Sequence, residues 1–68
     1  MASGTVKWFN PVRGFGFIRP DDGSRTVFVH ASVLERSELD ILVEGQKVRF
    51  EVQRARNGKL AAANLKAG

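Results

Sequence analysis

The most regular alternation of apolar and polar residues in the chain runs from Lys47 to Gln53. Successive side chains of a β-strand point to opposite faces, so this alternation predicts a strand with one buried face and one solvent face. The buried face is expected to hold Val48, Phe50 and Val52. An Asn57-Gly58 pair follows, which is the strongest short hairpin signal, and it predicts a turn into a further strand over Leu60 to Leu65.

Three more strands are predicted in the first half of the chain, where β-branched and aromatic residues are frequent. They span Thr5 to Asn10, Phe15 to Arg19 and Thr26 to His30. The turn residues Asn10-Pro11 and Pro20-Asp21-Asp22-Gly23-Ser24 separate them. Short strands whose edges can be protected only by closure indicate an all-β small barrel.

The segment from Ala31 to Val43 does not read as a strand. Ser32 followed by Glu35 matches a capping box, in which the serine side chain caps the first turn of a helix. We therefore expect one short helical turn after the third strand, followed by a long loop.

Composition limits the possible functions. The chain has 68 residues, one histidine and no cysteine, which predicts one small domain over residues 1–68 without disulfides or a structural zinc site. Its net charge of +4 favours a polyanionic partner. No apolar run approaches the ~20 residues needed to cross a bilayer, and no charged and apolar leader precedes the first strand. We therefore expect a soluble cytoplasmic protein with no membrane partner.

Two faces can be assigned to the second and third strands. One face would hold Phe15, Phe17, Phe28 and His30, and the other would hold Ile18, Val27 and Val29. Burying the first face would enclose a histidine ring nitrogen, which needs a hydrogen-bond partner, and would leave three aliphatic side chains in water. We expect the aliphatic residues inside and the four rings on a shared outer face, although alternation and charge alone leave open that the rings are ordinary core.

Exposed rings on adjacent strands cost stability and invite aggregation, so their presence on a surface suggests a function. Unpaired bases are flat, apolar on their faces and tethered to phosphates. A basic protein can stack such bases on its aromatic rings, at ~1–3 kcal/mol per base, while lysine and arginine meet the backbone. The pattern therefore favours a platform for single-stranded nucleic acid.

The first strand does not sort into two faces by simple alternation. Val6 has the character of a core residue and Trp8 that of a platform residue, yet both have the same parity. A bulge or strong coiling of this strand could reconcile the two positions.

Six motifs extend over most of the chain: GTVKWFN at 4–10, RGFGFI at 13–18, PDDGS at 20–24, VFVH at 27–30, EGQKVRFEV at 44–52 and AAANL at 61–65. In this order they resemble the bacterial cold shock domain. The resemblance implies a five-stranded antiparallel barrel of the OB-fold type with one short helical turn. It also implies binding of single-stranded RNA and DNA with little sequence preference, and a role as an RNA chaperone or a regulator of transcription or translation.

The resemblance also implies which residues bind nucleic acid. They are Lys7, Trp8, Phe9, Arg13, Phe15, Phe17, Phe28 and His30. Trp8, three of the phenylalanines and His30 match base-stacking positions, Phe9 lies at the edge of the binding face, and Lys7 supplies a basic contact. Arg13 stands where the family usually has lysine. Trp8 is thereby assigned to the surface.

The chain departs from the family pattern at three places. Ala31 stands where the family usually has an aromatic residue after VFVH, and Leu39 falls near the place of another in the following loop. In the last hairpin, Lys59-Leu60 after Gly58 replaces the usual Gly-Pro. These departures affect the outer part of the binding face and leave its centre intact.

Two other classes of function fit the sequence less well. A protein-interaction module could use the same aromatic face, but its binding would not weaken steeply with salt as binding to nucleic acid does. An enzyme is disfavoured because the single histidine has no cysteine or acid–base partners, and GFGF lacks the third glycine of a dinucleotide fingerprint. We expect a monomer without catalytic activity, cofactor, metal site or small-molecule substrate.

Overall fold

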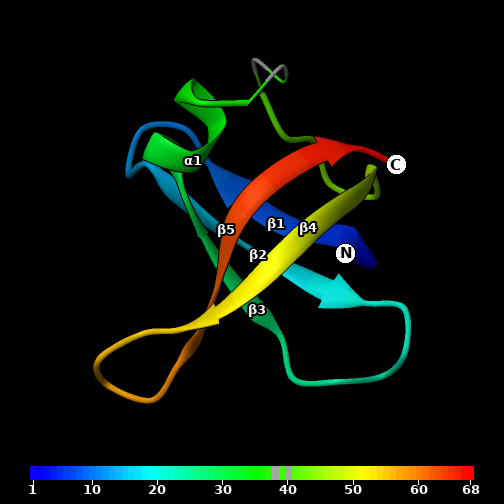
Figure 1. Cartoon of the computed structure of the whole chain (residues 1–68). Helices are drawn as coiled ribbons and strands as arrows, with labels where there is room; N and C mark the ends of the chain where they lie inside the picture. The colour runs from blue at the N-terminus through cyan, green and yellow to red at the C-terminus, as the bar shows by residue number, and fades with distance from the viewer. Residues whose placement is uncertain (38, 40) are drawn as a thin grey trace.

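Five strands and one short helix make up the fold in the computed structural model, which describes residues 1–37, 39 and 41–68. The elements are β1 (Ala2–Asn10), β2 (Phe15–Pro20), β3 (Val27–His30), α1 (Ala31–Glu35), β4 (Lys47–Arg54) and β5 (Leu60–Ala67). The strands close into a barrel in the order β1-β2-β3-β5-β4 (Figure 1). Strands β1 and β5 are longer than predicted, because pairing with β4 continues beyond their predicted ends.

The prediction of an all-β five-stranded barrel with a short helical turn after the third strand is confirmed. Four of the neighbouring strand pairs are antiparallel. The fifth pair, β3 with β5, is parallel and closes the barrel through the pairing of Phe28 with Ala61. Closure removes the open strand edges at which β-proteins associate.

The predicted turns connect the strands. The side-chain carbonyl of Asn10 accepts hydrogen bonds from the backbone N–H groups of Val12 at 3.0 Å and Arg13 at 3.1 Å. In the β4–β5 hairpin, Gly58 has a φ of 83°, a left-handed conformation that glycine adopts without steric cost. The asparagine before it accepts a hydrogen bond from the backbone N–H of Lys59 at 3.0 Å.

The interior is aliphatic except for Phe50, as the face assignment predicted. The buried residues are Val6, Ile18, Val27, Val29, Val33, Leu34, Leu42, Val48, Phe50, Ala62 and Leu65. The prediction that Val52 faces the core is wrong, because its side chain is 43% exposed. The register of β4 with β5 shifts between Glu51 and Val52. The additional residue at this shift is Ala63 of β5, because Glu51 pairs with Asn64 and Val52 with Ala62, so the alternation of β4 is not interrupted. Val52 is exposed because β4 runs beyond the buried core after Phe50, and residues 51–54 are all exposed.

The two ends of the barrel differ. Helix α1 and the β1–β2 turn lie at one end, and the β2–β3 loop and the β4–β5 hairpin lie at the other (Figure 1). Leu34 and Val33 are the buried residues of α1, so the helix covers its end of the core. Within the described residues, no helix has the length and apolar character needed to cross a bilayer. The loop predicted after the helix includes residues 38 and 40, which lie outside the described residues.

Candidate functional site

Five aromatic rings gather on the outer side of the barrel, over β1, β2 and β3. Strand register brings them together, since Trp8 pairs with Phe17, Phe17 with Phe28, and Phe15 with His30. We call this set the aromatic surface; it comprises Trp8, Phe15, Phe17, Phe28 and His30. The strand residues between these rings are buried, which confirms the predicted assignment of the two faces.

The rings of the aromatic surface support one another. Trp8 lies 5.4 Å from Phe15 and 5.9 Å from Phe17 between ring centroids, the first pair edge-to-face and the second stacked. Phe28 lies 5.7 Å from Phe15 and 6.0 Å from Phe17, and His30 lies 6.4 Å from Phe28. These separations fall within the range in which aromatic pairs attract. Each ring therefore has neighbours that hold its orientation while part of it remains in contact with solvent.

A bulge in β1 places Trp8 on this surface. Val6 is 1% exposed and pairs with Ile18, whereas Trp8 is 39% exposed and pairs with Phe17. The register therefore advances by one residue on β2 and by two on β1. Lys7 is the additional residue, and the two positions of equal parity consequently face opposite sides. The bulge suggested by the sequence is confirmed.

Gly16 allows β1 and β2 to approach closely beneath the rings. It pairs with Phe9, and a Cβ atom at this position would lie 2.3 Å from the backbone oxygen of Trp8 and 2.7 Å from the Cα of Phe9. Both obstructing atoms belong to backbone, which cannot move aside as a side chain can. Gly16 is therefore required for the spacing that brings Trp8 beside Phe15 and Phe17.

His30 joins the aromatic surface to α1. Its ring nitrogen Nδ1 accepts a hydrogen bond from the backbone N–H of Ser32 at 3.1 Å, so His30 is the N-cap of the helix. The prediction that Ser32 caps the helix is wrong: the cap lies two residues earlier, at His30, and Ser32 lies within the helix, which begins at Ala31. Because Nδ1 is the acceptor, the neutral ring carries its proton on Nε2, which leaves the ring a hydrogen-bond donor.

The three remaining predicted binding residues differ in their surroundings. Lys7 is exposed at the bulge, and Arg13 is exposed in the β1–β2 turn. Phe9 is half-buried and packs against the hydrophobic core. Two cations thus lie on the segments that border Trp8 and Phe15, whereas Phe9 has the environment of an inner residue.

The end of the aromatic surface nearest α1 lacks further rings. Ala31 is the first residue of the helix, and its N–H donates to the carbonyl of Gly14 at 2.8 Å. Leu39 is half-buried and packs against the core. Both residues, with Glu35, line an open hollow of about 350 Å³. The two departures from the family pattern therefore meet at one place and leave room there.

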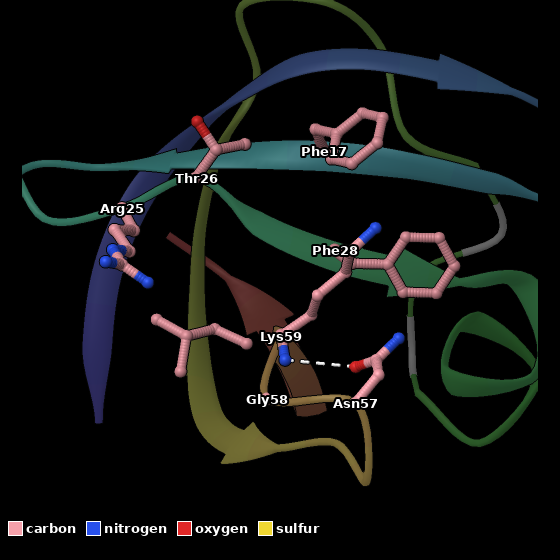
Figure 2. Close-up of a pocket in the computed structure, with 8 residues that line it drawn as sticks. Phe17, Arg25, Thr26, Phe28, Asn57, Gly58 and Lys59 are labelled. Carbon is pink, nitrogen blue, oxygen red and sulfur yellow. Dashed lines mark hydrogen bonds between the residues drawn. The ribbon is translucent and has the colours of Figure 1, made fainter.

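The opposite end of the aromatic surface has features that the sequence analysis did not select. Arg25 and Thr26 from the β2–β3 loop and Lys59 and Leu60 from the β4–β5 hairpin line a second hollow, next to Phe28 (Figure 2). A signal was present in the run from Arg54 to Lys59, which holds three cations and no acid. The sequence does not show that this run lies close to Arg25, because that proximity depends on the closure of the barrel.

Acidic groups in the β2–β3 loop are engaged locally. The side-chain hydroxyl and the backbone N–H of Ser24 both donate to Asp22, and these hydrogen bonds lower the pKa of its carboxyl below the ordinary value of 3.8. Asp21 forms an ion pair with Lys47 at 3.1 Å, and both side chains are largely exposed. An exposed pair of this kind contributes little to stability.

Comparison with known proteins agrees with this geometry. The family described as the 'Cold-shock' DNA-binding domain matches residues 2–67. The chain belongs to the cold shock domain family. It is 59% identical over 68 residues to cold shock protein CspA of Rhizobium meliloti (strain 1021), covering 98% of this chain and 99% of the relative. It is 51% identical over 63 residues to cold shock-like protein CspG of Escherichia coli (strain K12), covering 93% and 89%.

Membership of the cold shock domain family accounts for both the barrel fold and the aromatic surface. Cold shock domains are nucleic-acid-binding modules with an OB-type barrel, and the closed five-stranded barrel described above is consistent with that fold. The aromatic surface lies over β2 and β3, the face with which OB-folds bind oligonucleotides.

Proposed function

We propose that this cold shock domain binds single-stranded RNA and DNA by stacking unpaired bases on the aromatic surface. The observation that carries the proposal is the continuous set of five partly exposed rings over β1, β2 and β3 of a positively charged domain. Stacking contributes about 1–3 kcal/mol per base and tolerates any base, because every base has a π face.

Each of the eight candidate residues has a role in this proposal. Trp8, Phe15, Phe17, Phe28 and His30 stack bases, and the N–H at Nε2 of His30 can also donate to a base or a phosphate. Lys7 and Arg13 contact phosphates from the bulge and the β1–β2 turn. Phe9 supports the surface from its half-buried position next to Gly16.

The binding mode suggests a cellular role. A protein that binds any unpaired strand and excludes duplex shifts the equilibrium of a folded RNA toward its open form, because a ligand stabilises the state it binds. We therefore infer that the protein acts in the cytoplasm as a monomeric RNA chaperone, and through such opening regulates transcription or translation. This role needs no catalytic group, cofactor or metal.

Fluorescence of Trp8, the only tryptophan, tests the proposal. Oligonucleotides of mixed sequence, as matched RNA and DNA single strands, should quench its emission, while duplexes of the same sequence should do so far less because paired bases hide their faces. Affinity should also fall with salt, with log K decreasing by about 0.7 per unit of log salt for each phosphate neutralised. Equal quenching by duplex, or binding that does not respond to salt, would refute the stacking model.

A further inference from the structure

A hollow of about 400 Å³ lies where the aromatic surface meets the β4–β5 hairpin. Its apolar side is formed by Phe17, Phe28 and Leu60. Its polar side is formed by Arg25 and Thr26 from the β2–β3 loop and by Lys59 from the hairpin, and Figure 2 shows these groups reaching it from different elements. The hollow thus combines an apolar wall with cations, the chemistry of a site for a nucleotide.

The hollow is continuous with the aromatic surface. Phe17 and Phe28 belong to both, and their ring centroids lie 6.0 Å apart. A single strand whose bases stack on these two rings therefore runs next to the hollow.

Two cations line this hollow and two more lie on the β4–β5 hairpin. Arg25 and Lys59 line it, Arg54 and Arg56 belong to the same hairpin as Lys59, and all four residues are exposed. The ion pair found among residues 1–37, 39 and 41–68 joins Lys47 to Asp21 and involves none of them. The nearest acid in sequence to Arg25, Asp22, is hydrogen-bonded to Ser24.

The end of the aromatic surface nearest α1 has fewer groups that can bind a nucleotide. There Ala31 and the half-buried Leu39 provide no ring, and the carboxylate of Glu35 lines the hollow. A phosphate would meet repulsion at that end and attraction at the hairpin end. The two ends of the surface are therefore unequal in both stacking and charge.

We propose that one nucleotide of the bound single strand occupies the hollow, with its phosphate between Arg25 and Lys59 and its base against Phe28 and Leu60. The strand consequently extends past the rings toward the β4–β5 hairpin and ends short of α1. This inference rests on the proposed function and specifies which end of the site holds the strand by its phosphates.

The test removes the two cations and compares the salt dependence of binding. Arg25→Gln/Lys59→Gln lowers the net charge by two at the hollow. Arg49→Gln/Lys66→Gln lowers it equally on β4 and β5, where the two exposed residues pair directly across strands. Because like charges that face each other are destabilising, this control should fold at least as well as the wild type.

Oligothymidylates would be titrated into the three proteins at several salt concentrations, with Trp8 fluorescence as the readout and thermal melting as the check of folding. For Arg25→Gln/Lys59→Gln we expect weaker binding and a salt slope that is shallower by about 0.7, the value for one lost phosphate contact on a single strand. The control should keep the wild-type slope. Each single variant should show part of the loss, which provides a second measurement.

Two outcomes would overturn the inference. If the hollow variant and the control change the slope equally, the cations act only through net charge. If the hollow variant keeps the wild-type slope, no phosphate lies between Arg25 and Lys59. In both outcomes the wild type binds single strands. If the proposed function itself were wrong, the Trp8 fluorescence of the wild type would not change when oligothymidylate is added, so the two failures can be told apart.

Discussion

Replacing Phe28 and Phe50 separately by alanine should divide binding from stability. Phe50 is completely buried, and emptying a core phenylalanine costs about 3–5 kcal/mol. A domain of this length has about 3–10 kcal/mol of stability in total, so Phe50→Ala should leave much of the protein unfolded. Phe28 is half-buried and has ring neighbours at 5.7, 6.0 and 6.4 Å. Phe28→Ala loses only this partial burial and the weak attraction of the neighbouring rings. We therefore expect it to lower the free energy of unfolding by about 1–2 kcal/mol.

Phe28→Ala should therefore remain folded and lose binding, whereas Phe50→Ala should first lose stability. In urea or thermal unfolding followed by circular dichroism, Phe28→Ala should lower Tm by about 4–16 °C, since 1 kcal/mol corresponds to about 4–8 °C in a small domain. In oligonucleotide titrations it should lose about 1–3 kcal/mol of binding free energy, the contribution of one stacked base. If Phe28→Ala unfolds the protein as readily as Phe50→Ala, or binds single strands as tightly as the wild type, the separation of platform from core is refuted.

Three further predictions address other parts of the site. Gly16→Ala should lower stability by about 1–3 kcal/mol in thermal melts, because the added Cβ would lie 2.3 Å from the backbone oxygen of Trp8. An unchanged Tm would show that β1 and β2 can move apart without cost. Ala31→Phe should tighten binding by one stacking term, about 1–3 kcal/mol, at an unchanged salt slope, since a hollow of about 350 Å³ can receive the ring; a folded variant that binds no tighter would contradict this. Titration of Asp22 by NMR should give a pKa below 3.8 that rises in Ser24→Ala. Because the folded-state pKa is lowered, the stabilisation is present above the ordinary pKa and disappears as pH falls through the lowered value. A pKa unaffected by Ser24→Ala would contradict the assigned cause.

Turn chemistry and period-two alternation were sufficient to predict the strands and the division of faces. Pro20 to Ser24 and Asn57-Gly58 mark chain reversals in any context, and Ile18, Val27 and Val29 can be buried together only if the rings point outward. Alternation fails where a residue is added to a strand. Alternation also does not show where a strand leaves the core: β4 runs beyond it after Phe50, so Val52 is exposed, and nothing in the sequence of β4 distinguishes that position from Phe50.

Contacts between segments that are distant in sequence were also beyond the sequence analysis. Parallel closure of β3 on β5 brings the β4–β5 hairpin beside Phe28 and so creates the hollow between Arg25 and Lys59. Likewise, the cap of α1 comes from His30, a residue selected only as a stacking candidate. A histidine is an uncommon N-cap, and local propensity favoured Ser32.

The bulge at Lys7 adds one residue between two positions of β1 that face opposite sides of the barrel. Substituting Lys7 changes one exposed side chain. Deleting it would return β1 to simple alternation, in which Trp8 becomes the neighbour of Val6 and still points outward, opposite Phe17. The additional residue therefore contributes the local bend and twist of β1 and an exposed cation beside the indole, and a graft of the aromatic surface onto another barrel would need Val6 and Trp8 on opposite faces but not the bulge itself.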